Sequence, residues 1–226
     1  MPDNSRPNSQ PNSQPNSQPN SWSNSWQALR DSDRDLALCL LFSPASSRPV
    51  LADRLSLALE AEVSVRVTSE PMLAAIRLQW WADAIESRRH ENVPLMRRLL
   101  MHLEGGAIRQ DDLLAQLALW QDRLADNTVS AASCWQDVLV MLAGGQEPRH
   151  AAGRVGAALQ DHEQAAQLDD AILAALRTRH LYWIWMAGQL ARHRLSGRYR
   201  DDDALLVWRM LGWRFGIRRP SPLPSP

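Results

Sequence analysis

The chain has 226 residues, no formal net charge and 45% hydrophobic residues, which suits one globular domain with a substantial core. All 25 basic residues are arginine, and this excludes Schiff-base chemistry and the lysine of a phosphate-binding P-loop. Cys39 and Cys134 lie far apart in the sequence without metal-ligand spacing, so we expect a reducing compartment and two buried thiols.

Residues 1–28 are predicted to form a disordered tail. The unit Asn-Ser-Gln-Pro recurs every four residues and decays to Asn-Ser-Trp, which places Trp22 and Trp26 at its end. Such a polar tract cannot bury enough apolar surface to offset its ordering entropy. The polar start does not resemble a secretory signal peptide. Residues 218–226, rich in proline and serine, are predicted to form a second disordered tail.

Residues 29–217 are predicted to form one all-α domain, because apolar residues recur at helical spacing and no strand–helix alternation occurs. In the clearest helix Leu73, Ile76 and Trp80 share the expected core face. Trp81 would then lie at the edge, where Arg77 can stack on its indole. The expected helices span residues 33–42, 50–67, 70–89, 93–104, 111–126, 131–143, 148–166, 168–195 and 202–214.

The C-terminal part is basic, with ten arginines and three aspartates between Arg177 and Arg219. One interpretation is that these arginines form a solvated surface and that acidic residues in the N-terminal part balance their charge. The other is that they bind an anionic partner such as a phosphate or a lipid headgroup. Tyr182, Trp183 and Trp185 are predicted to be core and edge residues of a long helix. Together with Trp208, Trp213 and the neighbouring arginines they could instead form a patch for a membrane surface.

No apolar run is long enough to span a membrane. The expected location is the cytoplasm, with peripheral association with the inner membrane as the alternative. No nucleic-acid partner is expected.

The run Arg-Leu-Gln-Trp-Trp-Ala-Asp, from Arg77 to Asp83, resembles a signature of the squalene/phytoene synthase family. Upstream, Asp33-Arg34 and the turn Phe42-Ser43-Pro44 resemble the opening helix and loop of that family. Weaker similarity continues in later segments, so that the resemblance covers most of residues 31–215. The family-motif positions in this chain are Arg77, Gln79, Trp80, Trp81 and Asp83.

The resemblance implies an isoprenoid-synthase bundle, here truncated, around a deep apolar cavity. Arg48 and Arg66 are the expected contacts to a substrate or a diphosphate. Catalytic members of the family condense prenyl diphosphates and bind Mg²⁺ through two DxxxD motifs on facing helices. Carboxylates four residues apart share one helix face and can hold a hard cation together.

This chain departs from the family at both motifs. Where the first motif belongs, Glu62 is followed four residues later by Arg66, a cation that would pair with it. Where the second belongs, Asp161 has no carboxylate four residues away. These departures resemble a non-catalytic branch of the family that includes a mitochondrial assembly factor for respiratory complex I.

Two other acidic pairs have the same spacing. Asp122 and Asp126 form a literal DxxxD at a helix end, which we interpret as a solvated edge and keep as the weak candidate for a metal site. Asp31 and Asp35 flank Asp33 at a helix start, where capping and the helix dipole explain acidic residues.

The favoured hypothesis is a squalene/phytoene-synthase-like protein without catalysis, a binding or assembly factor that needs no cofactor. Its partner would be an apolar or prenyl ligand, or another protein. One alternative is an active prenyl transferase, which would require Mg²⁺. The other is a peripheral protein of a membrane surface.

Overall fold

The computed structural model describes residues 21–67, 70–89, 92–126, 128–144, 148–196, 199–200 and 203–217. Helices and no strands occur within these ranges, which confirms the predicted all-α class. Residues 1–20 and 218–226, which contain most of the two predicted tails, lie outside the described residues. The helices are α1 (Ser21–Ser32), α2 (Arg34–Leu40), α3 (Arg48–Val67), α4 (Pro71–Ser87), α5 (Pro94–Glu104), α6 (Gln110–Ala125), α7 (Ala131–Ala143), α8 (Arg149–Gln160), α9 (His162–Ala166), α10 (Asp170–Ala174), α11 (Tyr182–Arg194) and α12 (Leu206–Arg214).

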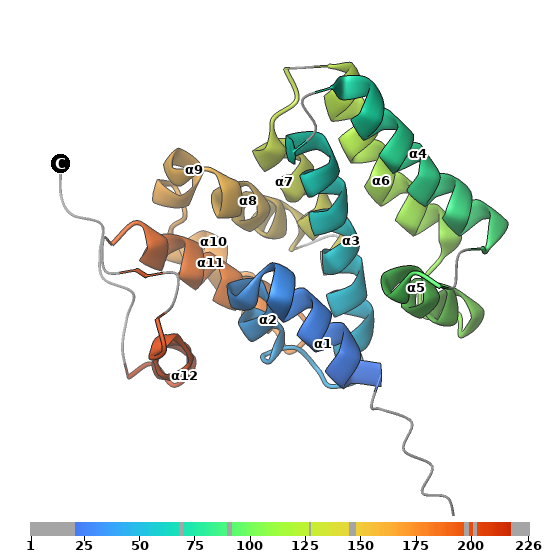
Figure 1. Ribbon diagram of the computed structural model, residues 1–226. Helices are drawn as coiled ribbons and strands as arrows, with labels where there is room; N and C mark the ends of the chain where they lie inside the picture. Colours follow the sequence, from blue (N-terminus) through green and yellow to red (C-terminus); the bar gives the residue numbers. More distant parts are fainter. Residues whose placement is uncertain are drawn as a thin grey trace, which may run out of the picture.

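The other helices are arranged around α3 (Figure 1). Every residue from Leu51 to Ala58 is buried, because α3 contacts α1, α2, α4, α5, α6 and α7. A helix that is covered on all sides needs apolar residues on all sides, and most residues of this stretch are Leu or Ala. The first half of α3 is therefore the centre of the core.

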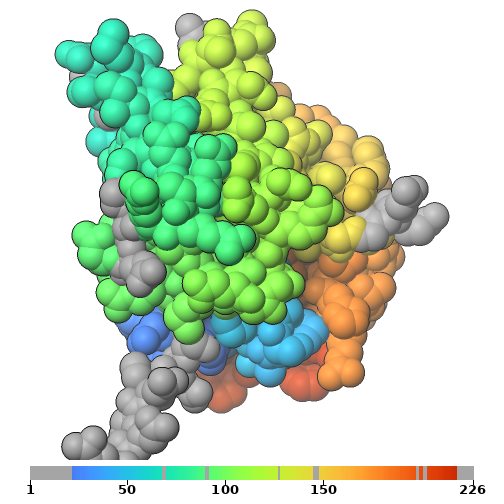
Figure 2. Space-filling model, turned by 90° about the vertical axis from the view of Figure 1, so that its right-hand side faces the viewer, coloured from blue at the N-terminus to red at the C-terminus, as the bar shows by residue number. Residues whose placement is uncertain are grey.

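The remaining helices pack in pairs. Helices α4 and α6 lie side by side and cover one face of the molecule (Figure 2). Helices α7 and α8 approach each other closely at Gly156, where a Cβ atom would lie 2.2 Å from the carbonyl oxygen of Trp135. Glycine is required at this position because any larger residue would overlap the backbone of α7. Helix α11 packs against α8 and α2.

Helix α1 corrects the predicted boundary of the N-terminal tail, since residues 21–28 belong to the fold. Trp22, Trp26 and Leu29 are spaced four and three residues apart and therefore share one face of a helix. Leu29 is fully buried, and both indoles pack against the core. The indole Nε1 of Trp26 also donates to the carbonyl oxygen of Ala37, 3.1 Å away. The end of the repeat is thus an amphipathic helix.

Two expected helices are each divided in two. The predicted helix 148–166 breaks at Asp161, whose extended backbone ends α8 and whose carboxylate caps α9 by accepting from the N–H groups of Glu163 and Gln164. The predicted helix 168–195 is interrupted between α10 and α11 by four exposed polar residues, 177–180. Caps and polar interruptions of this kind are weak sequence signals for the end of a helix, whereas apolar periodicity is a strong signal for the presence of one.

Side-chain hydrogen bonds cap α2 and join it to the C-terminal part of the chain. Asp33 caps α2 by accepting from the N–H of Leu36, as predicted. Asp35 is buried and accepts hydrogen bonds from the Arg194 guanidinium and the Tyr199 hydroxyl. Burial and the contact with Asp35 raise the pKa of Tyr199, so its hydroxyl stays protonated and keeps donating.

Both cysteine thiols are free and buried, as expected. Burial raises the pKa of Cys134 to about 11, so the thiol is protonated and a poor nucleophile at neutral pH. Within the described ranges, no helix has the length and apolar character needed to cross a membrane.

We predict that Leu29→Ala lowers the free energy of unfolding by about 2–5 kcal/mol, because it leaves a cavity where α1 meets the core. Urea unfolding followed by circular dichroism measures this loss. Leu73→Ala is the matched control, since the Leu73 side chain is half exposed and its truncation should change stability by less than about 0.5 kcal/mol. Equal losses in the two variants would show that α1 is not part of the folded unit.

Candidate functional site

Helix α4 turns a different face to the core from the one predicted. Trp81 is buried and Trp80 is half-buried, whereas Leu73 and Ile76 are exposed by 51% and 59%. The buried face instead contains Ala74, Leu78, Trp81, Ala82, Ala84 and Ile85. Apolar residues occur on both sides of this helix, so periodicity alone did not identify the side that packs.

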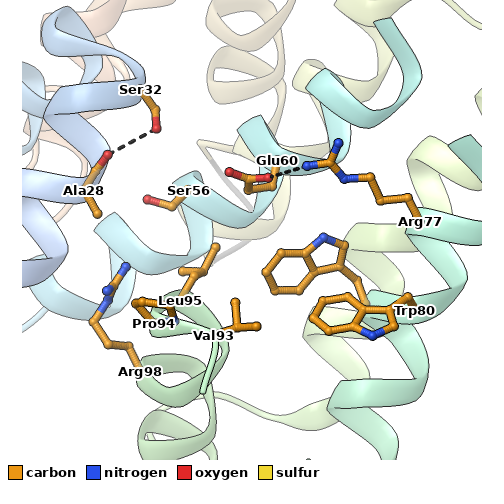
Figure 3. A pocket seen from close by; sticks show the side chains of 11 residues that line it. Ala28, Ser32, Ser56, Glu60, Arg77, Trp80, Val93, Pro94, Leu95 and Arg98 are labelled. Atoms are coloured by element: carbon orange, nitrogen blue, oxygen red, sulfur yellow. Dashed lines mark hydrogen bonds and ion pairs between the residues drawn. The ribbon is translucent and has the colours of Figure 1, made fainter. Parts of the chain in front are cut away.

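The motif helix borders a pocket between α1, α3, α4 and α5 (Figure 3). Its volume is about 420 Å³, within the range of pockets that hold small molecules. Trp80 and Trp81 form one wall, with ring centroids 5.2 Å apart in an edge-to-face arrangement. The described residues that line the pocket are Ala28, Ser32, Ser56, Glu60, Arg77, Trp80, Trp81, Val93, Pro94, Leu95 and Arg98.

Charged residues stand at the edge of this pocket. The Arg77 guanidinium lies 3.4 Å from the Glu60 carboxylate, and both side chains are about half exposed. Arg77 therefore pairs with α3, and the predicted stack of Arg77 on Trp81 is not among the cation–π contacts of the described residues. An ion pair this exposed contributes little to stability and can open to admit or contact a ligand.

Ser56 is a buried polar residue among those that line the pocket. Ser56 is 95% buried on α3, and its Oγ has no hydrogen-bond partner among the described residues. A buried hydroxyl without a partner loses free energy relative to water.

Behind the pocket, a buried carboxylate joins three helices. Asp53 of α3 is fully buried and accepts from the Ser25 hydroxyl (2.9 Å) and from Arg98 Nε (2.6 Å). His102 Nε2 lies 2.9 Å from the same carboxylate. The helices α1, α3 and α5 are thereby held together, and Arg98 is fixed where it lines the pocket.

The next residue of α3 makes a second buried polar contact. Arg54 Nε donates to Gln116 Oε1 of α6 (3.3 Å), and Gln116 Nε2 donates to the Arg54 carbonyl oxygen (2.8 Å). Burial lowers the pKa of Arg54. This pair fixes α6 against α3, and α4 packs on α6.

The sequence did not identify Asp53, Ser56, Arg98 or His102 as residues of this region. One signal was present: Asp53 and Arg54 interrupt an apolar helical run, and charged residues in such a run need buried partners. Which residues provide those partners depends on tertiary packing.

The remaining motif residues lie away from the pocket, on the side of α4 that faces α6. Gln79 donates to Asp83 (2.7 Å), four residues along the same helix, and accepts from Gln121 of α6 at 3.5 Å. Arg77, Trp80 and Trp81 thus line the pocket, whereas Gln79 and Asp83 are exposed.

The arginines expected to contact a substrate are both outside the pocket. Arg48 donates to the carbonyl oxygens of Ser43 (3.0 Å) and Leu41 (2.7 Å), and so binds the backbone that follows α2. Its guanidinium also lies 5.8 Å from the Trp22 ring. Arg66 is exposed near the end of α3. Neither residue is placed to contact a ligand beside Trp80.

The acidic positions of the two expected motifs have structural roles. Glu62 accepts a hydrogen bond from the Trp135 indole (3.0 Å), which corrects the prediction that Glu62 pairs with Arg66. Asp161 caps α9. Each carboxylate is therefore engaged in a different part of the fold.

The alternative acidic pair lies at the outer end of α6. Asp122 and Asp126 are exposed, and Asp126 accepts from the Thr128 N–H, which lowers the pKa of Asp126. The described ranges contain no group of three or more His, Cys, Asp or Glu side chains placed to hold a metal ion. The carboxylates of these ranges do not fit a Mg²⁺–diphosphate site, which needs several oxygen ligands on facing helices.

Comparisons of the chain with protein-family models, with curated proteins and with solved structures found no match. The resemblance to squalene/phytoene synthases therefore rests on the sequence motifs quoted above.

The two indoles should differ in their contribution to stability, in the order opposite to the sequence prediction. Trp81→Ala should lower the free energy of unfolding by roughly 3–5 kcal/mol, because it removes a buried aromatic side chain. Trp80→Ala should cost clearly less, since Trp80 is half-buried at the pocket wall. Thermal or urea unfolding of both variants measures the difference. A larger loss for Trp80→Ala would contradict the assigned orientation of α4.

Asp53→Asn should destabilise the protein by about 3–5 kcal/mol, since it leaves the Arg98 guanidinium without its buried counter-charge. The new amide would also direct N–H groups toward Arg98, Ser25 or His102. Glu60→Gln is the control, because the half-exposed pair with Arg77 should contribute only about 0–1 kcal/mol. Similar small losses in both variants would show that the Asp53 contacts do not stabilise the fold.

Proposed function

We propose that this protein is a squalene/phytoene-synthase-like protein without the catalytic activity of that family, a binding or assembly factor that holds an apolar ligand between α1, α3, α4 and α5. The observation that carries the proposal is the pocket beside Trp80 and Trp81. Three residues of the family-like motif line it, while the two acidic motif positions, Glu62 and Asp161, are hydrogen-bonded elsewhere.

The lining of the pocket suggests the chemistry of the ligand. Two indoles together with Val93, Pro94 and Leu95 form an apolar surface that favours a hydrocarbon chain. Arg77 and Arg98 border the same space, so a polar or anionic head group would find a guanidinium at the edge. An amphiphile such as a prenyl alcohol or prenyl phosphate fits both features.

Catalysis would need carboxylates within the pocket. Glu60 is the one acidic residue among the described residues that line it, and its carboxylate is paired with Arg77. Ionisation of a prenyl diphosphate requires metal ions that draw charge from the leaving group. Binding without turnover is the outcome that these residues support.

The proposal is tested with farnesol and farnesyl diphosphate as probes, in titration calorimetry with the purified full-length chain. Trp80→Ala should weaken farnesol binding roughly tenfold, because it removes a large part of the apolar wall. Trp208→Ala is the matched control, since it removes an indole that lies outside the pocket. No binding of either probe, or equal weakening by the two substitutions, would contradict the pocket assignment.

A separate assay tests the absence of catalysis. Incubation with farnesyl diphosphate, Mg²⁺ and a reductant should release no diphosphate and give no condensed product. Product formation that is abolished by Asp122→Ala or Asp126→Ala would overturn the proposal and would identify that exposed pair as the metal site of an active transferase.

A further inference from the structure

Helix α12 carries an apolar surface that no described part of the chain covers. Four side chains on α12 and at its two ends, which together we call the α12 face, are largely exposed: Leu205 (58%), Trp208 (70%), Phe215 (72%) and Ile217 (77%). The opposite side of the helix is anchored in the core by Leu206, Met210 and Trp213. The helix is therefore apolar on two sides, and one of them faces solvent.

The exposed side chains form one continuous surface. The residues of the α12 face line a common groove of about 490 Å³, together with Arg209, Leu211 and Gly212. A Schellman turn fixes its end: Gly216 adopts a φ of 69°, its N–H donates to Trp213, and the N–H of Ile217 donates to Gly212. This turn brings Ile217 back toward the last turn of the helix. The exposed surface is thus held by defined backbone hydrogen bonds.

Two cationic side chains are held at the start of α11, and one of them, Arg214, is the last residue of α12. The Arg214 guanidinium stands 4.2 Å from the Tyr182 ring centroid, and that of Arg177 stands 5.6 Å from the Trp185 centroid. The Tyr182 and Trp185 rings are themselves 4.8 Å apart. Two exposed arginines are therefore held by one aromatic pair at the start of α11.

The sequence that follows Asp203 is basic. No acidic residue follows Asp203, whereas four arginines do. Asp203 itself is paired with Arg209 Nε at 3.0 Å. From Arg200 to Arg219 the sequence contains five arginines and three aspartates, so an anionic surface would meet a net positive charge at this end of the chain.

We propose that the α12 face docks on a membrane surface that contains anionic phospholipids. A short helix can lie in the plane of such an interface, with its exposed apolar side chains inserted among the acyl chains. Indoles prefer the depth of the headgroups, and the arginines beside the face can bind phosphate oxygens with paired N–H groups. The proposal is independent of the ligand pocket, because the α12 face and the pocket share no residue.

An anionic lipid surface explains exposed apolar side chains together with arginines better than a second copy of this chain does. A twofold dimer places the same patch of both subunits in contact. The arginine-rich borders would then approach each other, and like charges would oppose the apolar contact. An anionic bilayer provides apolar contact and opposite charge together.

Co-sedimentation with phosphatidylcholine vesicles, with and without phosphatidylglycerol, tests the proposal on the full-length chain. We expect binding that requires phosphatidylglycerol and weakens as NaCl is raised, since salt screens the arginines. Trp208→Ala and Phe215→Ala should each reduce partitioning roughly tenfold. Arg214→Gln and Arg177→Gln should each reduce it roughly fivefold.

Matched controls lie on the other side of the molecule. Met72 of α4 is as exposed as Phe215, and Arg109 beside α6 is an exposed arginine, so Met72→Ala and Arg109→Gln should leave vesicle binding unchanged. Circular dichroism confirms that each variant is folded. Failure to bind phosphatidylglycerol vesicles, equal binding to neutral vesicles, or equal loss in the controls would overturn the proposal. A dimer in sedimentation equilibrium that Trp208→Ala dissociates would overturn it as well, and would assign the α12 face to a second copy.

Discussion

The burial of two charged residues on α3 is the constraint on which the rest of the fold depends. Asp53 and Arg54 lie in a stretch that other helices cover on every side. Unpaired charges in such an environment would be strongly destabilising, so each must find a partner on a neighbouring helix. Asp53 finds its partners on α1 and α5, where Arg98 supplies the counter-charge. Arg54 exchanges hydrogen bonds with the neutral amide of Gln116 on α6, and its Nη2 has no hydrogen-bond partner among the described residues. The positions of three helices relative to α3 follow from these contacts.

The pocket is a consequence of that arrangement. Helices α1 and α5 are held against α3, and α4 packs on α6 and α3 so that it borders the pocket together with α1, α3 and α5. Trp81 and Trp80 form one wall of this pocket. Arg98 lines the pocket because its Nε is bound to Asp53 behind it. The contacts of Asp53 thus hold the Arg98 guanidinium beside the apolar lining of the pocket. An amphiphilic ligand needs this combination of a cation and an apolar surface.

Helical class and most helix positions could be predicted from the sequence, because apolar residues at helical spacing are a strong signal over long segments. The orientation of α4 could not, since Leu73 and Ile76 continue the apolar pattern on the side that remains exposed. Helix α1 was missed because its residues belong to a polar repeat, and three apolar side chains suffice to anchor it. For the candidate site, the motif identified Trp80, Trp81 and Arg77. Ser56 and Arg98 come from other helices and depend on tertiary contacts that one sequence does not reveal.

The close approach of α7 and α8 at Gly156 has a consequence for how this sequence can change. Because the carbonyl of Trp135 occupies the place of a side chain, position 156 accepts no other residue unless that turn of α7 moves. Trp135 in turn donates its indole hydrogen to Glu62 of α3. A larger residue at 156 would therefore push the backbone of α7 away from α8, and that shift would move the Trp135 indole relative to the Glu62 carboxylate on a third helix.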